Sequence, residues 1–231
     1  RSIEDHFDDS FELDSQLNGT SKEHYLNEIK DVIEKATFTY VRQQKMLGLG
    51  DAILTGEPLI GRKPFAVILA DDLCDCTEKG VISQLISIYK EYQCSVIAIE
   101  EIPFAQAINY GIISGDLIDG NDNTYRVTNM FEKPNSHDLI DFLKVGDSSK
   151  DKPNLNAIIG RYILTPDIFD ILKKIKPGKN GEIQITDALL SQAKKGKVIA
   201  YKFKGQRFDC GSVEGYIKAI NQFAKKQGLT K

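Results

Sequence analysis

The sequence predicts an α/β fold in which a mixed, mostly parallel central sheet is flanked by helices. The first support is the apolar run 65–70, which ends in Asp71 and Asp72 and is typical of a strand covered on both faces. A helical pattern follows at about 78–92, and a second buried strand follows at 95–99. This order has the length of a parallel βαβ unit, so we expect a Rossmann-like sheet with residues 65–70 at its centre.

The residues before this unit are expected to form helices, one strand and a glycine-containing turn. Periodicity predicts a helix at 3–17 interrupted around 8–10, a helix at 21–35, a strand at 37–41 and a short helix at 52–54. Gly48 and Gly50 lie before the short helix and would let a backbone approach a flat ligand closely. A tight turn explains these two glycines equally well, because the third glycine of a dinucleotide-binding fingerprint is absent.

After residue 99 the pattern changes to strands that pair with their sequence neighbours. We expect an antiparallel pair at 110–114 and 125–131, a surface loop at 144–153, a strand at 157–164, a helix opening at 165–167, a turn at 176–181, a helix through 186–187 to about 194, a strand at 198–203 and a final helix at 213–226. The final helix is expected to dock through the apolar side chains of Val213, Tyr216, Ile217, Ile220 and Phe223.

Composition restricts the class of protein. Of 231 residues, 41% are hydrophobic and 27% are charged, which is typical of a soluble globular protein. A net charge of −3 gives no reason to expect binding to nucleic acid or membranes, and no apolar stretch reaches the roughly 20 residues that span a bilayer. The four cysteines form no CxxC pair, so we expect reduced thiols in a cytoplasmic protein.

Three short blocks place charged side chains at predicted strand ends. Asp71 follows the first apolar run, with Asp72 expected to face solvent; Glu132 and Lys133 precede a proline; Asp209 precedes a glycine. If these blocks converge, they offer carboxylates for a hard divalent cation such as Mg²⁺, a lysine for a phosphate and a glutamate for sugar hydroxyls. Each block alone is more often a turn or a pair of exposed charges.

The chain resembles the nucleotidyltransferase family that acts on sugar 1-phosphates, in its bacterial uridylyltransferase branch. The resemblance extends over essentially all 231 residues. The matching blocks, which are specific only in combination, are residues 3–8, 41–43, 48–50, 67–72, 110–113, 132–134, 159–162, 181–187 and 209–211.

The resemblance implies which residues bind nucleotide and metal. Gln43 and the backbone at Gly48 would read the uracil edge of UTP. Asp71 and, by analogy with thymidylyltransferases, Asp209 would hold Mg²⁺ against the phosphates. The implied reaction is in-line attack of glucose 1-phosphate on the α-phosphorus of UTP, which forms UDP-glucose and pyrophosphate without a covalent enzyme intermediate.

The resemblance also implies a sugar site and a domain organisation. Gly111, Glu132 and the backbone near Ile158 would bind glucose hydroxyls, and Lys133 would pair with the sugar phosphate as a catalytic group alongside Asp71 and Asp209. The implied organisation is one domain, 1–231, with an antiparallel sugar-binding portion at 101–165 and a C-terminal helix at 213–231. A dimer or tetramer is expected, with the C-terminal helix as one candidate interface.

Several points stay open at this stage. The family's glycine-rich nucleotide loop would lie upstream of residue 1, so residues 1–231 alone are expected to be inactive. Asp51, Asn154, Asn156 and the cysteines receive no role. The alternatives are the same fold acting on another sugar 1-phosphate or on dTTP, and a non-catalytic relative that serves as a nucleotide-sugar sensor or assembly subunit.

Overall fold

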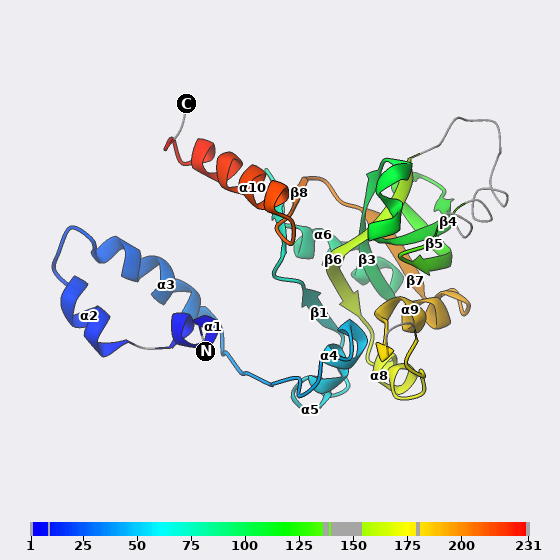
Figure 1. The fold of residues 1–231 in the computed structure, drawn as a ribbon, viewed down its shortest axis with the longest axis horizontal. Helices are drawn as coiled ribbons and strands as arrows, with labels where there is room; N and C mark the ends of the chain where they lie inside the picture. Colours follow the sequence, from blue (N-terminus) through cyan, green and yellow to red (C-terminus); the bar gives the residue numbers. More distant parts are fainter. Residues whose placement is uncertain (1, 9, 136–138, 140–153, 179–180, 230–231) are drawn as a thin grey trace. The chain divides into compact units, whose positions relative to one another are not determined.

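The computed structural model describes residues 2–8, 10–135, 139, 154–178 and 181–229, and the chain divides into two compact units. Unit 1 is Arg1–Gln44 and unit 2 is Lys45–Lys231, and each is described by itself. The helices of unit 1 are α1 (Ser2–Phe7), α2 (Phe11–Leu17) and α3 (Glu23–Lys35) (Figure 1). The predicted interruption around 8–10 is confirmed, because Ser10 caps α2 by accepting a hydrogen bond from the N–H of Leu13 at 3.4 Å.

The predicted strand at 37–41 is wrong. These residues have no regular secondary structure, and Tyr40 and Val41 are exposed. Phe38 stacks on Phe7 of α1 with ring centroids 4.5 Å apart, so this segment is placed by an aromatic contact and not by a ladder of hydrogen bonds. β-Branched and aromatic residues are favoured in strands because they pack well on a pleated surface. A segment rich in them forms a strand only where another strand is available to pair with it.

Unit 2 contains a six-stranded sheet, a two-stranded sheet and the remaining helices. The central sheet has the order β1-β6-β3-β7-β5-β4. Its strands are β1 (Phe65–Ile68), β3 (Ser95–Ile102), β4 (Gly111–Ile118), β5 (Asn121–Glu132), β6 (Leu155–Leu164) and β7 (Val198–Lys202). The helices are α4 (Leu49–Thr55), α5 (Glu57–Ile60), α6 (Val81–Tyr92), the 3₁₀ helix η1 (Phe104–Asn109), α8 (Asp167–Leu172), α9 (Ile185–Ala193) and α10 (Val213–Lys226).

The mixed α/β fold with a central sheet flanked by helices is confirmed, but two details of the predicted sheet are wrong. Among the described strands only β3 and β7 pair in parallel, and the other pairings are antiparallel. Strand β1 lies at the edge of the sheet, beside β6, and its Ile68 is 59% exposed. β1 and β3 run parallel with β6 inserted between them, which sequence order cannot reveal because β6 comes about 60 residues later.

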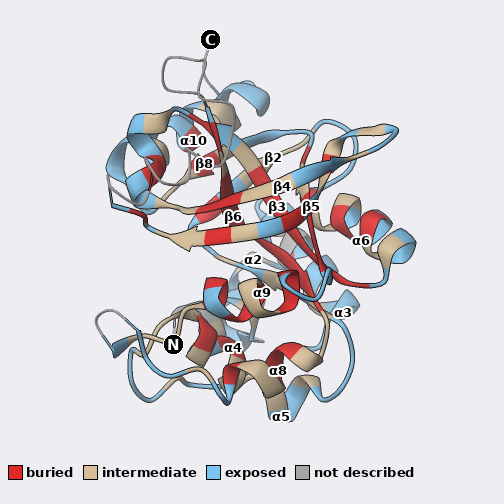
Figure 2. Cartoon of the chain, turned by 90° about the vertical axis from the view of Figure 1, so that its right-hand side faces the viewer, coloured by how far each residue is buried: buried red, intermediate tan, exposed pale blue. Residues whose placement is uncertain are grey.

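The core lies on both faces of this sheet. Alternate residues of β3 face opposite sides: Val96 and Ala98 pack in one cluster with α6, and Ile97 and Ile99 pack in another with α8 and α9. Figure 2 shows the buried residues concentrated on the strands and on the sides of α6 and α9 that pack inward. The continuous apolar run of β3 therefore reflects burial on both faces. The expectation that the run at 65–70 is covered on both faces is wrong, because Ala66 and Ile68 of β1 are exposed.

A second, two-stranded sheet was not predicted and matters most for the site. Strand β2 (Asp72–Asp75) pairs antiparallel with β8 (Gln206–Asp209). The register sets Asp72 directly opposite Asp209, although the two residues are far apart in sequence. Residues directly opposite each other share one face of the sheet, so this pairing brings two acidic side chains to the same place.

The C-terminal helix is confirmed, but most of its predicted docking face is wrong. Of the five predicted residues, Phe223 is partly buried and packs with its ring centroid 6.3 Å from that of Phe208 in β8. Val213, Tyr216, Ile217 and Ile220 of α10 are between 50% and 80% exposed, and Ala219 is the buried residue of this helix. Figure 1 shows α10 projecting beyond β8. An amphipathic pattern identifies a face that favours an apolar partner, but it does not identify the partner.

The predicted loop at 144–153 lies outside the described residues, and so do two residues of the predicted turn at 176–181. No helix in the described part of the chain combines the length and the apolarity required to cross a bilayer.

Candidate active site

A cavity of about 430 Å³ in unit 2 brings most of the predicted site residues together. The predicted residues that line it are Gly48, Asp71, Gly111, Glu132, Lys133, Ile158 and Asp209. Gln43 belongs to unit 1, so this cavity does not test its predicted role. The sequence predicted a site only if the three charged blocks converge, and in the structure they line one cavity. The role of each residue stays a prediction.

Asp71 and Asp209 approach each other across Gly211. A Cβ atom added at Gly211 would lie 3.1 Å from Oδ1 of Asp209 and 3.5 Å from Oδ2 of Asp71, so the two carboxylates flank one point. The backbone N–H of Cys210 also donates to the carbonyl oxygen of Asp71 at 2.7 Å, which holds the two segments side by side. Glycine at 211 leaves open the space between two oxygens that a divalent cation could use.

The orientation of Asp209 is set by three neighbours. Its Oδ2 accepts a hydrogen bond from the hydroxyl of Tyr110 at 2.9 Å and lies 3.5 Å from Nη2 of Arg207. Its Oδ1 accepts from the backbone N–H of Gly211 at 3.1 Å. Oδ2 is therefore engaged by the protein, while Oδ1 is the oxygen on the side of Asp71.

The expectation that Asp72 faces solvent is wrong. Asp72 is 6% exposed, and its Oδ2 accepts a hydrogen bond from the backbone N–H of Gly160 at 2.6 Å. Its Oδ1 accepts from Nε of Arg207. Asp72 begins β2 with its side chain toward β6, whereas Asp71 lies in the turn before the strand. Asp72 is thus a buried structural acid and Asp71 the exposed one.

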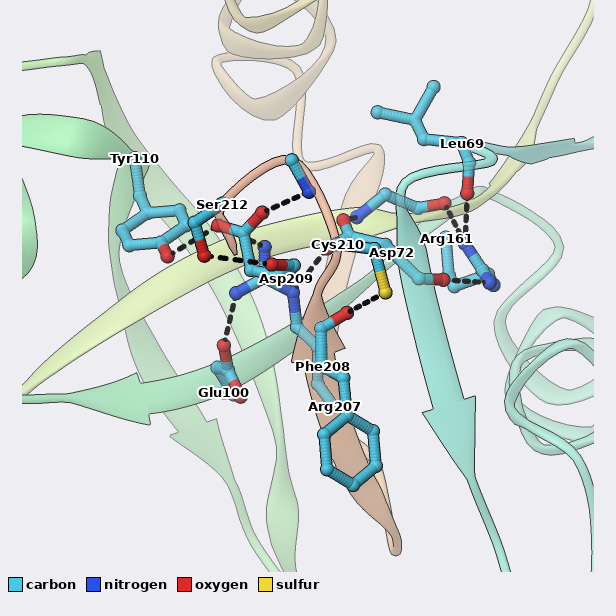
Figure 3. A network of polar contacts seen from close by, with 12 residues as sticks. Leu69, Asp72, Glu100, Tyr110, Arg161, Arg207, Phe208, Asp209, Cys210 and Ser212 are labelled. Atoms are coloured by element: carbon cyan, nitrogen blue, oxygen red, sulfur yellow. Dashed lines mark hydrogen bonds and ion pairs between the residues drawn. The ribbon is translucent and has the colours of Figure 1, made fainter. Parts of the chain in front are cut away.

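Arg207 joins the two sheets in the polar network of Figure 3. Its side chain is 7% exposed and also donates from Nη1 to Oε1 of Glu100, a residue of β3, at 2.7 Å. The guanidinium carbon lies 5.0 Å from the ring centre of Tyr110. Burial lowers the pKa of Arg207, but its contacts with Tyr110 and the carboxylates outweigh burial and raise the pKa above its ordinary value. The guanidinium is therefore charged throughout the range in which the protein is folded.

A second cluster in the same cavity contains the predicted sugar residues. A Cβ atom added at Gly111 would lie 3.2 Å from each of three neighbours: Oε2 of Glu132, Cδ1 of Ile158 and Cγ2 of Thr186. Thr186 donates from its hydroxyl to Oε2 of Glu132 at 3.1 Å. Burial raises the pKa of Glu132 above its ordinary value, and the hydrogen bond from Thr186 opposes this effect.

Lys133 has an unusual backbone conformation. Its φ is +41°, a region that residues with a side chain seldom adopt, and its N–H donates to the carbonyl oxygen of Tyr110 at 3.2 Å. Pro134 follows directly and is buried. Strained backbone of this kind persists where the surroundings hold it and is common at functional sites. The strain therefore agrees with a role for the exposed Lys133 side chain at the cavity.

The two glycines at the start of α4, Gly48 before its first residue and Gly50 within its first turn, pack against the chain itself. Gly48 has a φ of +91°, and a Cβ atom there would lie 3.0 Å from Cβ of Glu182 and 3.0 Å from the carbonyl oxygen of Ile183. At Gly50, a Cβ atom would lie only 2.6 Å from the same carbonyl. Gly50 is thus needed for close packing, whereas Gly48 also lines the cavity and keeps its predicted role as a proposal.

The donor set fits a divalent metal ion that completes its coordination with phosphates and water. Among the described residues no three His, Cys, Asp or Glu side chains gather in a way that could hold a metal. Asp71 and Asp209 do bring two carboxylates to one point. Mg²⁺ is commonly held by one or two carboxylates together with substrate phosphates, so two acids suffice for this ion but not for a closed structural site.

Sequence reasoning missed the residues that hold the predicted ligands in place. Tyr110 and Thr186 received no role because each lies far in sequence from the acid it contacts. Arg207 likewise lies far in sequence from Asp72 and Glu100. One local signal was available for Arg207: it precedes Asp209 by two residues, and side chains two apart on a strand point to the same face. That signal depends on predicting β8, whose four residues carry no strong strand pattern.

Comparison with known proteins gives consistent results. The profile of the family described as nucleotidyl transferase matches residues 9–226. A UTP–glucose-1-phosphate uridylyltransferase of Pseudomonas aeruginosa is 53% identical over 222 residues, which are 96% of this chain and 74% of the relative.

Solved structures agree with the sequence match. The crystal structure of an apo UDP-glucose pyrophosphorylase superposes with a TM-score of 0.86 at 53% identity, covering 98% of this chain and 78% of that chain. A UDP-glucose pyrophosphorylase complexed with UDP-glucose superposes with a TM-score of 0.82 at 51% identity, covering 98% and 77%.

Proposed function

The chain belongs to the nucleotidyl transferase family, and from this premise we propose that it is a UTP–glucose-1-phosphate uridylyltransferase. The proposed reaction forms UDP-glucose and pyrophosphate from UTP and glucose 1-phosphate. An oxygen of the sugar phosphate attacks the α-phosphorus of UTP, the bond from that phosphorus to the bridging oxygen breaks, and pyrophosphate leaves. No covalent intermediate with the protein is required.

The observation that carries the proposal is the shared cavity of unit 2. Its wall contains two acids that flank one point, the exposed Asp71 and the half-buried Asp209, and a separate group around Glu132 with the ammonium-bearing Lys133 next to it. This arrangement suits a substrate with a phosphate chain at one end and a hexose at the other. Phosphoryl transfer depends mainly on positioning and on charge neutralisation, and the cavity offers groups for both.

Each residue has a proposed task. Asp71 and Asp209 hold a divalent ion, which when bound supplies positive charge to the attacked phosphate. Lys133 pairs with the phosphate of the sugar. Glu132 accepts hydrogen bonds from glucose hydroxyls, and Gly111 leaves the sugar the space that a Cβ atom would fill. Gln43 and the backbone at Gly48 read the uracil edge.

Enzymes of this family typically use a divalent metal ion, and we propose Mg²⁺ for this protein. The two carboxylate oxygens at this point favour a hard cation over zinc or copper. We further propose a cytoplasmic homo-oligomer, a dimer or tetramer, which light scattering would test. The exposed apolar side chains of Val213 and Ile217 on α10 support self-association.

A coupled assay tests the activity. The full-length protein is incubated with UTP and glucose 1-phosphate, and pyrophosphate release and UDP-glucose are both measured with and without Mg²⁺. The proposal expects equimolar products that depend on the metal. Replacing UTP with dTTP, or glucose 1-phosphate with galactose 1-phosphate, should lower kcat/KM. No UDP-glucose at any Mg²⁺ concentration, or equal rates with dTTP, would contradict the proposal.

A further inference from the structure

Arg207 occupies a position that the proposed mechanism leaves without a task. It is buried, and its guanidinium contacts three carboxylates from three strands: Asp72 of β2, Glu100 of β3 and Asp209 of β8. Tyr110 adds an aromatic ring at 5.0 Å. Figure 3 shows Arg207 between Glu100 and the Tyr110–Asp209 pair. One carboxylate would be enough to pair with a buried guanidinium, so three carboxylates suggest a further task for Arg207.

The contacts of Arg207 fall into two groups, one that holds the arginine itself and one that engages Asp209. Nε donates to Asp72, and Nη1 donates to Glu100 at 2.7 Å. These two hydrogen bonds anchor the arginine to both sheets. Nη2 lies 3.5 Å from Oδ2 of Asp209, and the same oxygen accepts from the Tyr110 hydroxyl at 2.9 Å. Both contacts to Asp209 engage Oδ2, so rotation of the carboxylate is restricted and Oδ1 stays on the side of Asp71.

Tyr110, Arg207 and Asp209, together with Asn109, border two cavities: the 430 Å³ cavity and a larger one of about 940 Å³ that extends along α10. The carboxylate of Asp209 is therefore held between two open spaces by its hydrogen bonds and its ion pair. Tyr110 and Arg207 engage Oδ2, and the backbone N–H of Gly211 engages Oδ1.

We propose that Arg207, with the ring of Tyr110 beside its guanidinium, is a positioning residue that aims Oδ1 of Asp209 at the metal site shared with Asp71. The inference rests on the proposed function in taking Asp209 as a metal ligand. Planar geometry and several fixed donors are what the task requires, because one group must bridge acids in three directions. Lysine carries the same charge but offers a single point of attachment.

Two other roles for Arg207 make different predictions for metal affinity. If the arginine acts only through its charge, removing that charge makes the site more negative and metal binding tightens. If it serves only to stabilise the fold, substitutions lower the unfolding temperature and leave metal affinity as it was. Positioning predicts weaker binding even when the charge is kept.

The experiment compares Arg207→Lys, Arg207→Gln and Tyr110→Phe in the full-length protein with Arg62→Lys as the matched control. Arg62 makes a bidentate pair with Asp170, at 3.0 and 2.6 Å, on an exposed surface that does not line either cavity. Mn²⁺ is titrated in the presence of saturating UDP-glucose, and free Mn²⁺ is measured by electron paramagnetic resonance. Thermal unfolding is recorded for every variant.

Loss of a partner that orients a metal ligand typically weakens metal binding by roughly 10–100-fold. We expect Arg207→Lys to lie in this range and Tyr110→Phe to weaken binding by a smaller factor, with Arg62→Lys unchanged. Mn²⁺ affinity within twofold of the wild type in Arg207→Lys, or tighter binding in Arg207→Gln, overturns the proposal. If the arginine variants do not fold, unchanged affinity in Tyr110→Phe overturns it.

The result separates this inference from the proposed function. A wild-type protein that makes no UDP-glucose contradicts the proposed function, whereas the Mn²⁺ affinities still compare the variants. A wild-type protein that makes UDP-glucose and an Arg207→Lys variant with normal Mn²⁺ affinity contradict only the positioning role.

Discussion

Asp71 and Asp72 are adjacent, chemically identical and expected to respond to substitution in opposite ways. Asp72 is buried, accepts the N–H of Gly160 at 2.6 Å and faces the Arg207 guanidinium, so Asp72→Ala removes one member of a buried ion pair. Asp71 is exposed, and its hydrogen bond with Cys210 uses its backbone carbonyl, which alanine keeps. We therefore expect Asp72→Ala to destabilise the fold and Asp71→Ala to leave it intact.

The magnitude follows from the contacts that remain. Breaking a buried ion pair costs roughly 3–5 kcal/mol when one charge is left unpaired. Arg207 keeps Glu100 at 2.7 Å after the substitution, so we expect the lower end, about 3 kcal/mol. For a domain of this size, a loss of about 3 kcal/mol corresponds to a fall in Tm of about 6–12 °C. An exposed substitution such as Asp71→Ala should stay within about 0.5 kcal/mol.

The assay is thermal unfolding followed by circular dichroism, with both variants and the wild type in the same buffer. Asp72→Asn serves as the matched variant, because its amide oxygen still accepts the Gly160 N–H while the charge facing Arg207 is lost. It should fall between wild type and Asp72→Ala. Equal Tm values for Asp72→Ala and wild type would refute the assignment of Asp72 as a buried structural acid, and so would an equal loss in Asp71→Ala.

Three further predictions concern the sugar cluster and its surroundings. Glu132→Ala should raise the KM for glucose 1-phosphate roughly tenfold or more with a smaller effect on UTP, since it removes a charged acceptor for the hexose; equal effects in steady-state kinetics would count against it. Burial raises the pKa of Glu132, so the folded state binds its proton more tightly than the unfolded chain, and the stability this contributes below the unfolded pKa is lost as pH rises through the folded pKa. In urea unfolding, Glu132→Gln should therefore gain stability relative to wild type as the pH rises above the ordinary pKa of glutamate, and a constant difference would contradict this. Gly160→Ala should destabilise by about 1–3 kcal/mol, because its Cβ would lie 2.6 Å from Oδ2 of Asp72 and 2.6 Å from Cβ of Leu69; wild-type stability would show that the site has room.

Local pattern predicted most of the elements. The apolar run of β3, the hairpin of β4 and β5 and the long helices α3, α6 and α10 all appear near their expected bounds. Each of these elements is specified by residues within one window, through alternation, helical spacing or turn residues. Predictions of secondary structure or burial were wrong where a residue or strand distant in sequence determines the local structure.

Two failures illustrate this. The segment 37–41 has strand-like residues, but the described residues of unit 1 form no strand that could pair with it. Strands β2 and β8 have weak patterns but form a sheet because each is the other's partner. The same reason explains the error at Asp72. Its environment is created by Arg207 and Gly160, and neither can be associated with it from the order of residues.

In the candidate site, too, some residues could be predicted from local sequence and others could not. The residue types that bind phosphate, metal and sugar could be singled out by resemblance and by their position after strands, and the geometry brings most of them to one cavity. The supports of these residues could not be predicted, because Tyr110 and Thr186 act through contacts made only in the folded chain. The sequence of this chain is therefore more informative about the candidate binding residues than about the residues that contact and hold them.

The central claim is that Asp71 and Asp209 hold one divalent ion together, and a single set of rate measurements tests it. Turnover of UTP and glucose 1-phosphate is measured across a range of Mg²⁺ concentrations for Asp71→Asn, Asp209→Asn and the double variant. A bound metal supplies several kcal/mol of charge stabilisation at about 1.4 kcal/mol per tenfold in rate, so each single variant should lose roughly 100-fold or more with its unfolding unchanged. Because both acids serve the same ion, the double variant should be little slower than either single one. Turnover near that of the wild type in Asp71→Asn, or losses that multiply in the double variant, would contradict the account.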